Sequence, residues 1–427
     1  MKKLVIKNGR LVDPTREFDH VTDLALEDGF VRQIGQNIDA TGSEVFDASG
    51  LVVTPGFIDM HVHLREPGFE HAETIETGSR AAAAGGFTSI CCMPNTEPVN
   101  DNATVTSYIV DRARRFAKVN VFPIGAITKN SAGEELAAFA SMKQAGIVAI
   151  SDDGRPVMNA RVVRRAMEFA GALNLPLIEH CEDLHLSAGG DMHEGFESTR
   201  LGLRGIPRSS EDVMVARDLI LAEVTGVRYH IAHISSANSV QLVAGAKHRG
   251  LPVTSEATPH HFALADAEMR PYDSDYKMKP PLREARDVEA VTSGLLDGTI
   301  DAIATDHAPH PGAEKMQEFE RCPFGIIGLE TAIGLALERL YHTGRASLSH
   351  VVRLFTAGPA KIVLPGRGSL REGAPADVTI LGLDHEWTYD VKRSPSKSHN
   401  TPFNKHKFRG GPLATIVAGE IVWRFDP

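Results

Sequence analysis

Two histidines, His61 and His63, stand one residue apart in a mostly apolar stretch of the 427-residue chain. Side chains along a β-strand alternate between its two faces, so both imidazoles would lie on the same side. In that arrangement the pair can bind one metal ion. The same spacing also occurs in packed or exposed histidine pairs, so the pair alone leaves both interpretations open.

Further residues of the types that bind metals follow other apolar runs. They are Asp153, His180, His233 and Asp306. One catalytic zinc usually takes about three protein ligands, whereas six ligands with one shared carboxylate suit two ions about 3.5–4 Å apart. A hydroxide held between two such ions would attack an unactivated amide carbonyl. Because nitrogen and oxygen ligands favour zinc, we expect two Zn²⁺ ions per chain.

The segments that carry these residues alternate between short apolar runs and helical stretches such as Ala160–Leu173 and Asp212–Val224. We predict eight strands, at Phe57–Leu64, Thr88–Met93, Asn120–Ile124, Ile147–Ser151, Pro176–Glu179, Tyr229–Ile234, Pro252–Ser255 and Asp301–Ala304. This alternation implies parallel strands with right-handed crossovers, and eight units predict an α/β protein with a (β/α)₈ TIM barrel. Barrel enzymes place catalytic groups at the C-terminal strand ends, where all six residues fall, and this favours the metal interpretation.

Both ends of the chain have a different pattern, with short strands and tight turns. Leu4–Ile6 precedes a predicted turn at Asn8-Gly9, and the runs up to residue 54 suggest antiparallel pairing. Similar runs return near Asp377–Leu381 and Thr415–Val417. We therefore predict a small β-sandwich-like domain built from residues 1–54 and 366–427, beside a catalytic barrel of residues 55–365.

Two loops would lie at the mouth of that barrel. Arg65 follows the histidine pair, and its guanidinium suits either a bidentate carboxylate clamp or an ordinary surface ion pair. The second loop, residues 310–328, is rich in glycine and proline and is typical of a lid. His310 begins this loop, close in sequence to Asp306.

The composition excludes several classes of partner. The formal net charge is −10, which disfavours nucleic acid and anionic membranes. The four cysteines show no metal-binding or redox spacing and indicate reduced thiols. The apolar run Leu4–Ile6 is too short for a signal peptide, so we expect a cytoplasmic protein.

Several motifs together resemble the amidohydrolase superfamily and, within it, the dihydroorotase family of the bacterial class I type. The segments that carry the resemblance span essentially the whole chain and are Asp59–Gly68, Pro94–Thr96, Lys277–Arg283, Ala304–His310 with Lys315, and Asn400–Phe403. The histidine pair alone marks only the superfamily, whereas the first and fourth segments together are much more specific. The family reversibly interconverts N-carbamoyl-L-aspartate and L-dihydroorotate in pyrimidine (UMP) biosynthesis, with a metal-bridging hydroxide and an aspartate proton carrier.

The resemblance also implies a role for each matching residue. The first metal would be bound by His61, His63 and Asp306, the second by His180 and His233, and Asp153 would bridge both. Asp306 would also carry the proton. The substrate carboxylate would be held by Arg65, Asn95 and His310, and the ring would contact the backbone at Phe324 and Gly325. Lys279 departs from the pattern, because relatives usually have asparagine before Pro280-Pro281, but a lysine can still donate a hydrogen bond to substrate.

Two alternatives and two partners stay open. Hydantoinases and dihydropyrimidinases resemble the chain but bridge their metals with a strand-four lysine, which Ile147–Ser151 lacks; allantoinase is a further cyclic amidase to test. The chain could instead be an inactive scaffold for aspartate transcarbamoylase, although all six ligand positions are filled. A homodimer is expected from base rates, and an active enzyme could also associate with aspartate transcarbamoylase.

Overall fold

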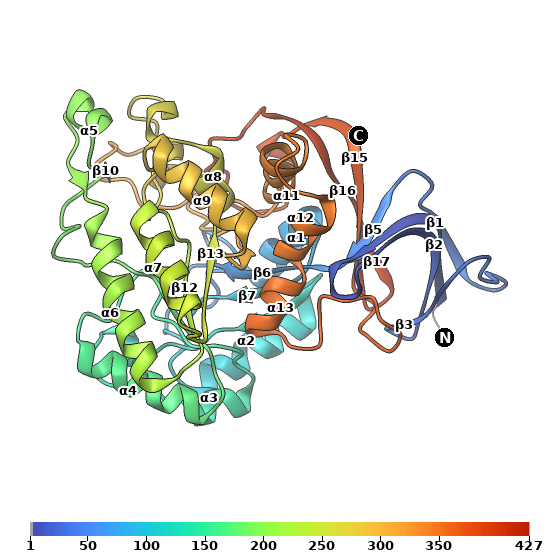
Figure 1. Cartoon of the computed structure of the whole chain (residues 1–427), viewed down its shortest axis with the longest axis horizontal. Coiled ribbons are helices and arrows are strands. Elements are labelled where there is room, and N and C mark those ends of the chain that lie inside the picture. The colour runs from blue at the N-terminus through green and yellow to red at the C-terminus, as the bar shows by residue number, and fades with distance from the viewer. Residues whose placement is uncertain (1–2, 427) are drawn as a thin grey trace.

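Strands from the two ends of the chain form one eight-stranded sheet in the computed structural model, which describes residues 3–426. The strands are β1 (Lys3–Asp13), β2 (Phe18–Glu27), β3 (Phe30–Gly35), β4 (Glu44–Asp47), β5 (Val52–Pro55), β15 (Val378–Thr388), β16 (Lys407–Val417) and β17 (Glu420–Arg424). Their order is β17-β16-β15-β5-β1-β2-β3, and β4 pairs with β1. The sheet lies at one end of the molecule, on the side where both termini are marked (Figure 1). Residues 1, 2 and 427, the outermost of the predicted β domain, fall outside the described residues.

The pairing within this sheet corrects two predictions. The expected turn at Asn8-Gly9 is a β-bulge inside β1, where Asn8 has a φ of 60° and the register with β2 shifts between Ile6 and Gly9. The sheet is also mixed, because β4 and β5 both run parallel to β1. A bulge inserts an extra residue into one strand while the pairing with the neighbouring strand continues on both sides of it. Strand pairing connects all eight strands in one sheet and does not show the two facing layers of a sandwich. The sandwich-like arrangement therefore stays a prediction.

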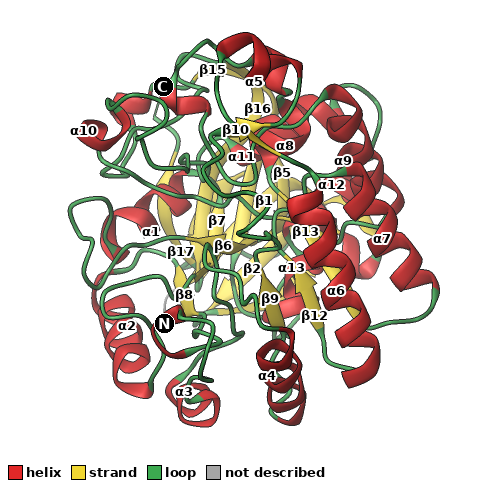
Figure 2. Cartoon of the chain, turned by 90° about the vertical axis from the view of Figure 1, so that its left-hand side faces the viewer, coloured by secondary structure: helices red, strands yellow, loops and turns green. Residues whose placement is uncertain are grey.

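Seven short parallel strands lie in the middle of the chain. One sheet holds β6 (Phe57–Val62), β7 (Phe87–Cys92) and β8 (Asn120–Pro123), and the other holds β9 (Leu177–Glu179), β12 (Tyr229–Ile231), β13 (Val253–Ala257) and β14 (Ala302–Ile303). Figure 2 shows the helices arranged around these strands. Most of these strands are buried, as expected for parallel strands covered by helices, whereas β8 is half-buried over most of its length.

Two extended segments lie between the edges of these sheets. Ile150 makes parallel bridges to both Gly125 and Leu177, and His307 bridges Val62 in the same way. The strand predicted at Ile147–Ser151 is therefore absent as a regular strand, and only single bridges at Ile150 remain of it. Its backbone still donates from Ile150 to Pro176 and accepts from Gly125, so the segment is held on both sides.

The helices lie mostly between consecutive parallel strands. They are α1 (Ile75–Ala84), α2 (Ala103–Phe116), α3 (Phe139–Ala145), α4 (Ala160–Ala172), α5 (Phe196–Leu201), α6 (Ser209–Thr225), α7 (Ala237–His248), α8 (Pro259–Ala263), α9 (Ala285–Asp297), α10 (Gly312–Lys315), α11 (Ala332–Ala336), α12 (Leu348–Phe355) and α13 (Ala357–Val363). The two helices predicted from sequence are confirmed as α4 and α6. Asn159 caps the first turn of α4, whose inward face places Val162, Ala166 and Ala170 at helical spacing.

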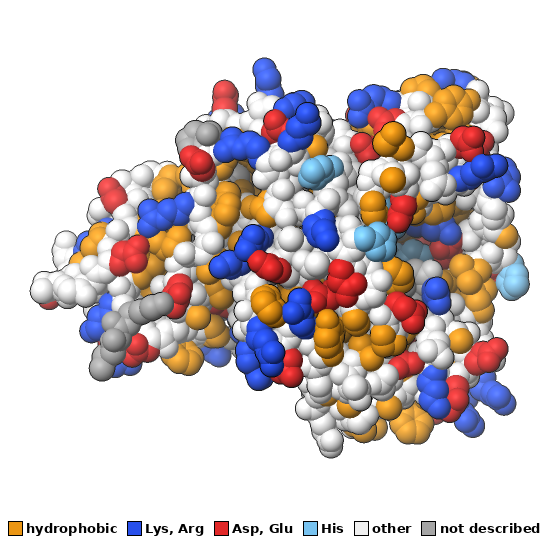
Figure 3. Space-filling model, turned by 180° about the vertical axis from the view of Figure 1, so that it is seen from behind, with side chains coloured by type: hydrophobic (Ala, Val, Ile, Leu, Met, Phe, Trp, Pro, Cys, Tyr) orange, Lys and Arg blue, Asp and Glu red, His pale blue; other side chains and the backbone are white. Residues whose placement is uncertain are grey.

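A small excursion follows β9. Strands β10 (Met192–His193) and β11 (Gly205–Ile206) pair in parallel on either side of α5. Within the described residues, no helix is both long and apolar enough to cross a bilayer. Charged side chains of both signs are spread over the face in Figure 3 rather than gathered into a field of one sign.

Candidate metal and substrate site

The six predicted ligand residues meet around the carboxylate of Asp153. Its Oδ1 lies 3.3 Å from His61 Nε2, 3.6 Å from His233 Nε2 and 3.8 Å from His180 Nδ1. Its Oδ2 lies 3.5 Å from His63 Nε2. One carboxylate therefore faces four imidazoles, with its two oxygens divided between them, as expected of a group that bridges two cations.

Asp306 completes the cluster on the side of the first histidine pair. Its Oδ1 is 3.0 Å from His63 Nε2 and 3.5 Å from His61 Nε2. His180 Nδ1 and His233 Nε2 are 2.9 Å apart on the other side. All of these side chains are buried. The structure thus brings together every metal-binding residue expected from sequence, and their individual roles stay predictions.

The donor atoms fit metal ions better than they fit one another. His61 Nε2 and Asp153 Oδ1 are buried without a hydrogen-bond partner. Ligand atoms of His61, His63 and Asp306 lie within 4.8 Å of one another, and so do those of His61, Asp153 and His233. Burial opposes ionisation of Asp153, but the facing histidines hold its pKa well below the usual range. An ionised carboxylate among converging imidazole nitrogens is a suitable ligand set for Zn²⁺.

The outer nitrogens of three histidines have polar partners that fix the orientation of each ring. His61 Nδ1 lies 2.8 Å from Glu256 Oε1, and His63 Nδ1 lies 2.9 Å from Asn95 Oδ1. His180 Nε2 lies 2.9 Å from Glu182 Oε2. When the outer nitrogen donates to an oxygen, the inner nitrogen keeps its lone pair for a metal. Asn95 uses only its carbonyl oxygen in this contact, so its amide nitrogen is available for the substrate.

The backbone at Asp306 is held in an uncommon conformation. Asp306 has a φ of 48°, in the left-handed region. The preceding Thr305 is fixed by Asp59, which accepts from the Thr305 amide at 3.1 Å and from its hydroxyl at 2.5 Å. His233 and Arg65 also have positive φ, at 31° and 59°. Such residues cost about 1–3 kcal/mol each and persist where neighbouring contacts enforce them, often at functional sites.

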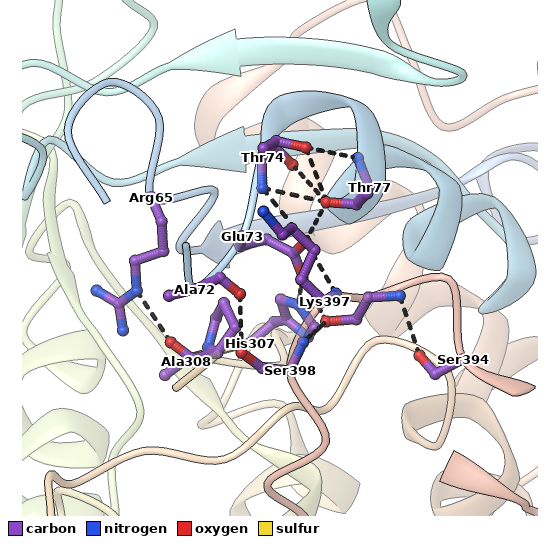
Figure 4. Close-up of polar contacts among 12 residues, drawn as sticks. Arg65, Ala72, Glu73, Thr74, Thr77, His307, Ala308, Ser394, Lys397 and Ser398 are labelled. Carbon is purple, nitrogen blue, oxygen red and sulfur yellow. Dashed lines mark hydrogen bonds and ion pairs between the residues drawn. The ribbon is translucent and has the colours of Figure 1, made fainter. Parts of the chain in front are cut away.

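Glu73 fixes the residue on the other side of Asp306 (Figure 4). Its buried carboxylate lies 3.4 Å from His307 Nε2, and it accepts hydrogen bonds from the hydroxyls of Thr77 and Ser396 and from the Lys397 amide. Burial disfavours the charge, but these contacts, above all that with His307, keep the pKa of Glu73 below its usual value. Glu73 thereby joins the start of α1, the Asp306 segment and a stretch that precedes β16.

Arg65 and His310 lie together at the edge of the metal cluster. Arg65 Nε donates to the Pro309 carbonyl at 3.2 Å, and its Nη2 is 3.3 Å from His310 Nε2. Burial and the neighbouring Arg65 lower the pKa of His310 to about 3, so this imidazole is neutral at pH 7. No carboxylate within residues 3–426 forms an ion pair with Arg65. Its guanidinium is therefore free to bind an anionic group of a ligand.

The predicted lid is tied down by two buried polar side chains. Lys315 Nζ donates to the carbonyls of Pro323 and Gly325, and Asn400 Nδ2 donates to those of Ala308 and Gly325. The Gly325 amide donates to the Lys277 carbonyl. Both backbone polar groups of Gly325 are thus already bonded within the protein. A Cβ at this position would lie 2.8 Å from that of Ala308, which explains the glycine.

Phe324 and Lys279 are adjacent on the other side of the site. Lys279 Nζ lies 5.0 Å from the centre of the Phe324 ring and 2.7 Å from Glu182 Oε1. The substrate contact expected of Lys279 from sequence stays a prediction, and in the structure its ammonium pairs with the carboxylate of Glu182.

A third group of metal-ligand types, His193, Glu284 and Asp287, lies outside this cluster. Arg208 already pairs with both carboxylates, and its Nε is 2.8 Å from Asp287. Burial and the adjacent arginines lower the pKa of His193 to about 4. The guanidinium of Arg208 therefore already occupies the position that a metal ion would take between these carboxylates.

Comparison with known proteins agrees with this geometry. The dihydro-orotase-like family model matches residues 50–239. A dihydroorotase from Solibacter usitatus is 66% identical over 98% of both chains, and one from Pelotomaculum thermopropionicum is 54% identical over the same share of each. The chain belongs to the dihydroorotase family.

The solved structures that resemble this dihydroorotase family member share its fold at lower identity. The L-hydantoinase (dihydropyrimidinase) from Arthrobacter aurescens has a TM-score of 0.88 and 26% identity, with 99% of this chain and 96% of that chain covered. A D-hydantoinase from Thermus sp. has a TM-score of 0.84 and 25% identity, with 99% and 97% covered. These likenesses support the α/β architecture.

Sequence reasoning missed the carboxylates that support the ligands in this dihydroorotase family member. Glu256 lies at the C-terminal end of β13, one residue beyond the strand predicted from sequence. Glu182 follows His180 by two residues, so the strand-end argument that identified His180 could also have identified Glu182. A buried acidic residue at a strand end was the available signal, whereas Glu73 offered none, because its partners come from distant segments.

Proposed function

We propose that this chain interconverts L-dihydroorotate and N-carbamoyl-L-aspartate at a centre of two Zn²⁺ ions. The observation that carries the proposal is the position of Asp153, whose two oxygens face four histidine nitrogens at 3.3–3.8 Å. Family membership supplies the reaction class. The bridges at Ile150 and His307 support a closed eight-stranded barrel as the scaffold.

The residues divide into two metal-binding sets. His61, His63 and Asp306 would hold one ion, His180 and His233 the other, and Asp153 would contact both. When bound, two such ions supply Lewis acidity, which makes water nucleophilic at neutral pH and polarises an amide carbonyl.

The protein groups can do the remaining work. Arg65 would bind the substrate carboxylate, helped by the Asn95 amide and by His310, which is neutral and lies against the guanidinium. Asp306 would take a proton from the attacking water at its carboxylate and deliver it to the ring nitrogen as the carbon–nitrogen bond of the amide breaks. In the cyclisation direction the steps reverse: Asp306 would take a proton from the carbamoyl nitrogen as the carbon–nitrogen bond forms and deliver it to the oxygen that leaves as water. The left-handed backbone at Asp306, fixed by Asp59 and Glu73, holds the carboxylate in place.

The test is turnover of dihydroorotate followed by ultraviolet absorbance, with zinc-loaded protein and with chelator-treated protein. The proposal expects chelator-sensitive hydrolysis that zinc restores, with none on allantoin or dihydrouracil. Turnover of a hydantoin or allantoin instead would assign the chain to another cyclic amidase. Bound zinc without any turnover would favour a scaffold for aspartate transcarbamoylase.

The assembly is a separate part of the proposal. We expect a cytoplasmic homodimer that can associate with aspartate transcarbamoylase. Light scattering after size exclusion, with the chain alone and with added transcarbamoylase, tests both. A monomer under all conditions would contradict the dimer, and separate elution would contradict the association.

A further inference from the structure

Lys279 takes part in a chain of contacts that ends at a predicted metal ligand. Its Nζ lies 2.7 Å from Glu182 Oε1, and the other oxygen, Oε2, lies 2.9 Å from His180 Nε2. The side chain of Glu182 is 7% exposed and that of Lys279 is 27% exposed. The two oxygens of one carboxylate thus connect the ammonium to the imidazole.

This arrangement determines how His180 can present its nitrogens. A carboxylate beside Nε2 accepts a hydrogen bond from the N–H at that position, so Nδ1 carries the lone pair that can bind a metal. His180 Nδ1 points into the cluster, 2.9 Å from His233 Nε2 and 3.8 Å from Asp153 Oδ1.

The other ligand histidines are supported differently. Glu256 contacts His61 and also faces His230, at 3.3 Å, while His63 is supported by the neutral Asn95. Of the carboxylates in direct contact with outer nitrogens of the ligand histidines, within the described residues, only Glu182 pairs with a lysine. The Phe324 ring packs on the same ammonium at 5.0 Å, which restricts where it can move.

We propose that Lys279 is a positioning residue that acts through Glu182 on His180 and strengthens the site for the second metal ion. The inference rests on the proposed two-metal centre and adds to it a role for Lys279. An ammonium 2.7 Å from Oε1 limits rotation of the Glu182 carboxylate, so Oε2 stays against His180 Nε2 and Nδ1 stays turned toward the second ion.

The experiment measures zinc binding rather than turnover. Metal-free protein is titrated with Zn²⁺ against a competing chelator of known affinity, and the stepwise constants of the two sites are fitted. The variants are Lys279→Met, Lys279→Arg, Glu182→Gln and the double variant Lys279→Met/Glu182→Gln. Lys247→Met is the matched control, because Lys247 forms a 2.6 Å ion pair with Asp301 at a comparable exposure of 23%, away from the site.

We expect Glu182→Gln to weaken the second site by about 10–100-fold and to leave the first within about threefold. Lys279→Met should weaken the second site by about tenfold, and Lys279→Arg should restore most of that loss. The double variant should match Glu182→Gln alone, because the lysine acts only through the carboxylate. Lys247→Met should change neither site.

Several results would overturn the inference. They are an unchanged second site in Lys279→Met, equal losses at both sites, full additivity in the double variant, or a wild-type chain that binds one zinc. A raised KM for dihydroorotate with unchanged zinc binding would instead make Lys279 a substrate contact. Failure of the proposed function is seen separately, as two bound zinc ions without turnover of dihydroorotate.

Discussion

Replacing Arg65 by methionine tests how the site selects its substrate. The guanidinium has two neutral protein partners, the Pro309 carbonyl and His310, and no protein carboxylate within the described residues. A substrate carboxylate would therefore be its main charged partner. Charge-assisted hydrogen bonds contribute about 1.5–3 kcal/mol, and because a guanidinium can donate two of them to one carboxylate we expect a loss of about 2–3 kcal/mol. That corresponds to roughly 30–150-fold in affinity.

The assay compares ligands with and without the carboxylate. Arg65→Met should raise the KM for dihydroorotate and the inhibition constant of orotate by that factor, while zinc content stays at the wild-type value. Binding of uracil, a planar ring without the carboxylate, should change less than threefold. Equal losses for orotate and uracil, or a loss of zinc, would refute the clamp and point to a structural role for Arg65.

Three further perturbations have defined outcomes. Glu256→Gln should weaken the first zinc site by about 10–100-fold, measured by chelator competition, because His61 loses its charged partner; unchanged affinity would contradict this. Asp306→Asn should lower kcat by about 10²–10⁴-fold in protein whose zinc content is assayed in parallel, and near-normal turnover would exclude Asp306 as the proton carrier. Burial raises the pKa of Glu330 from 4.5 to about 7, against hydrogen bonds from Ser394 and Tyr389. The folded state therefore loses stability as pH rises from about 4.5 to 7, by up to about 3 kcal/mol, and Glu330→Gln should flatten that part of the Tm profile; a parallel profile would show that Glu330 does not cause it.

The sequence predicted the architecture wherever local pattern and long-range packing agree. Helices α4 and α6 were expected within a few residues of their bounds, because a cap and a buried face define each one. The strand at Ile147–Ser151 failed, since its neighbours pair with it only at Ile150. The turn predicted at Asn8-Gly9 failed for a related reason: a residue suited to left-handed backbone fits both a turn and a bulge, and only the partner strand decides between them.

The residues of the site likewise divide into those that local sequence pattern identifies and those that only distant contacts reveal. Expected ligands such as His61 and His180 are found from sequence because they fall at the C-terminal ends of parallel strands. Glu73 and Asp59 could not be found this way, because their function lies in contacts with segments more than two hundred residues distant, at Thr305 and His307. Lys279 was assigned to the substrate from sequence, and only the position of Glu182 showed another partner.

The pairing of β5 with β15 has a consequence for how the protein is made. Pro55 pairs with Val378, so one edge of β5 has no neighbour until the ribosome has reached β15. An uncovered strand edge is a site for aggregation and for chaperone binding. A chain that stops after the last helix would carry every expected metal ligand yet keep that edge open. The β5 edge would therefore be covered only in copies whose synthesis has passed β15.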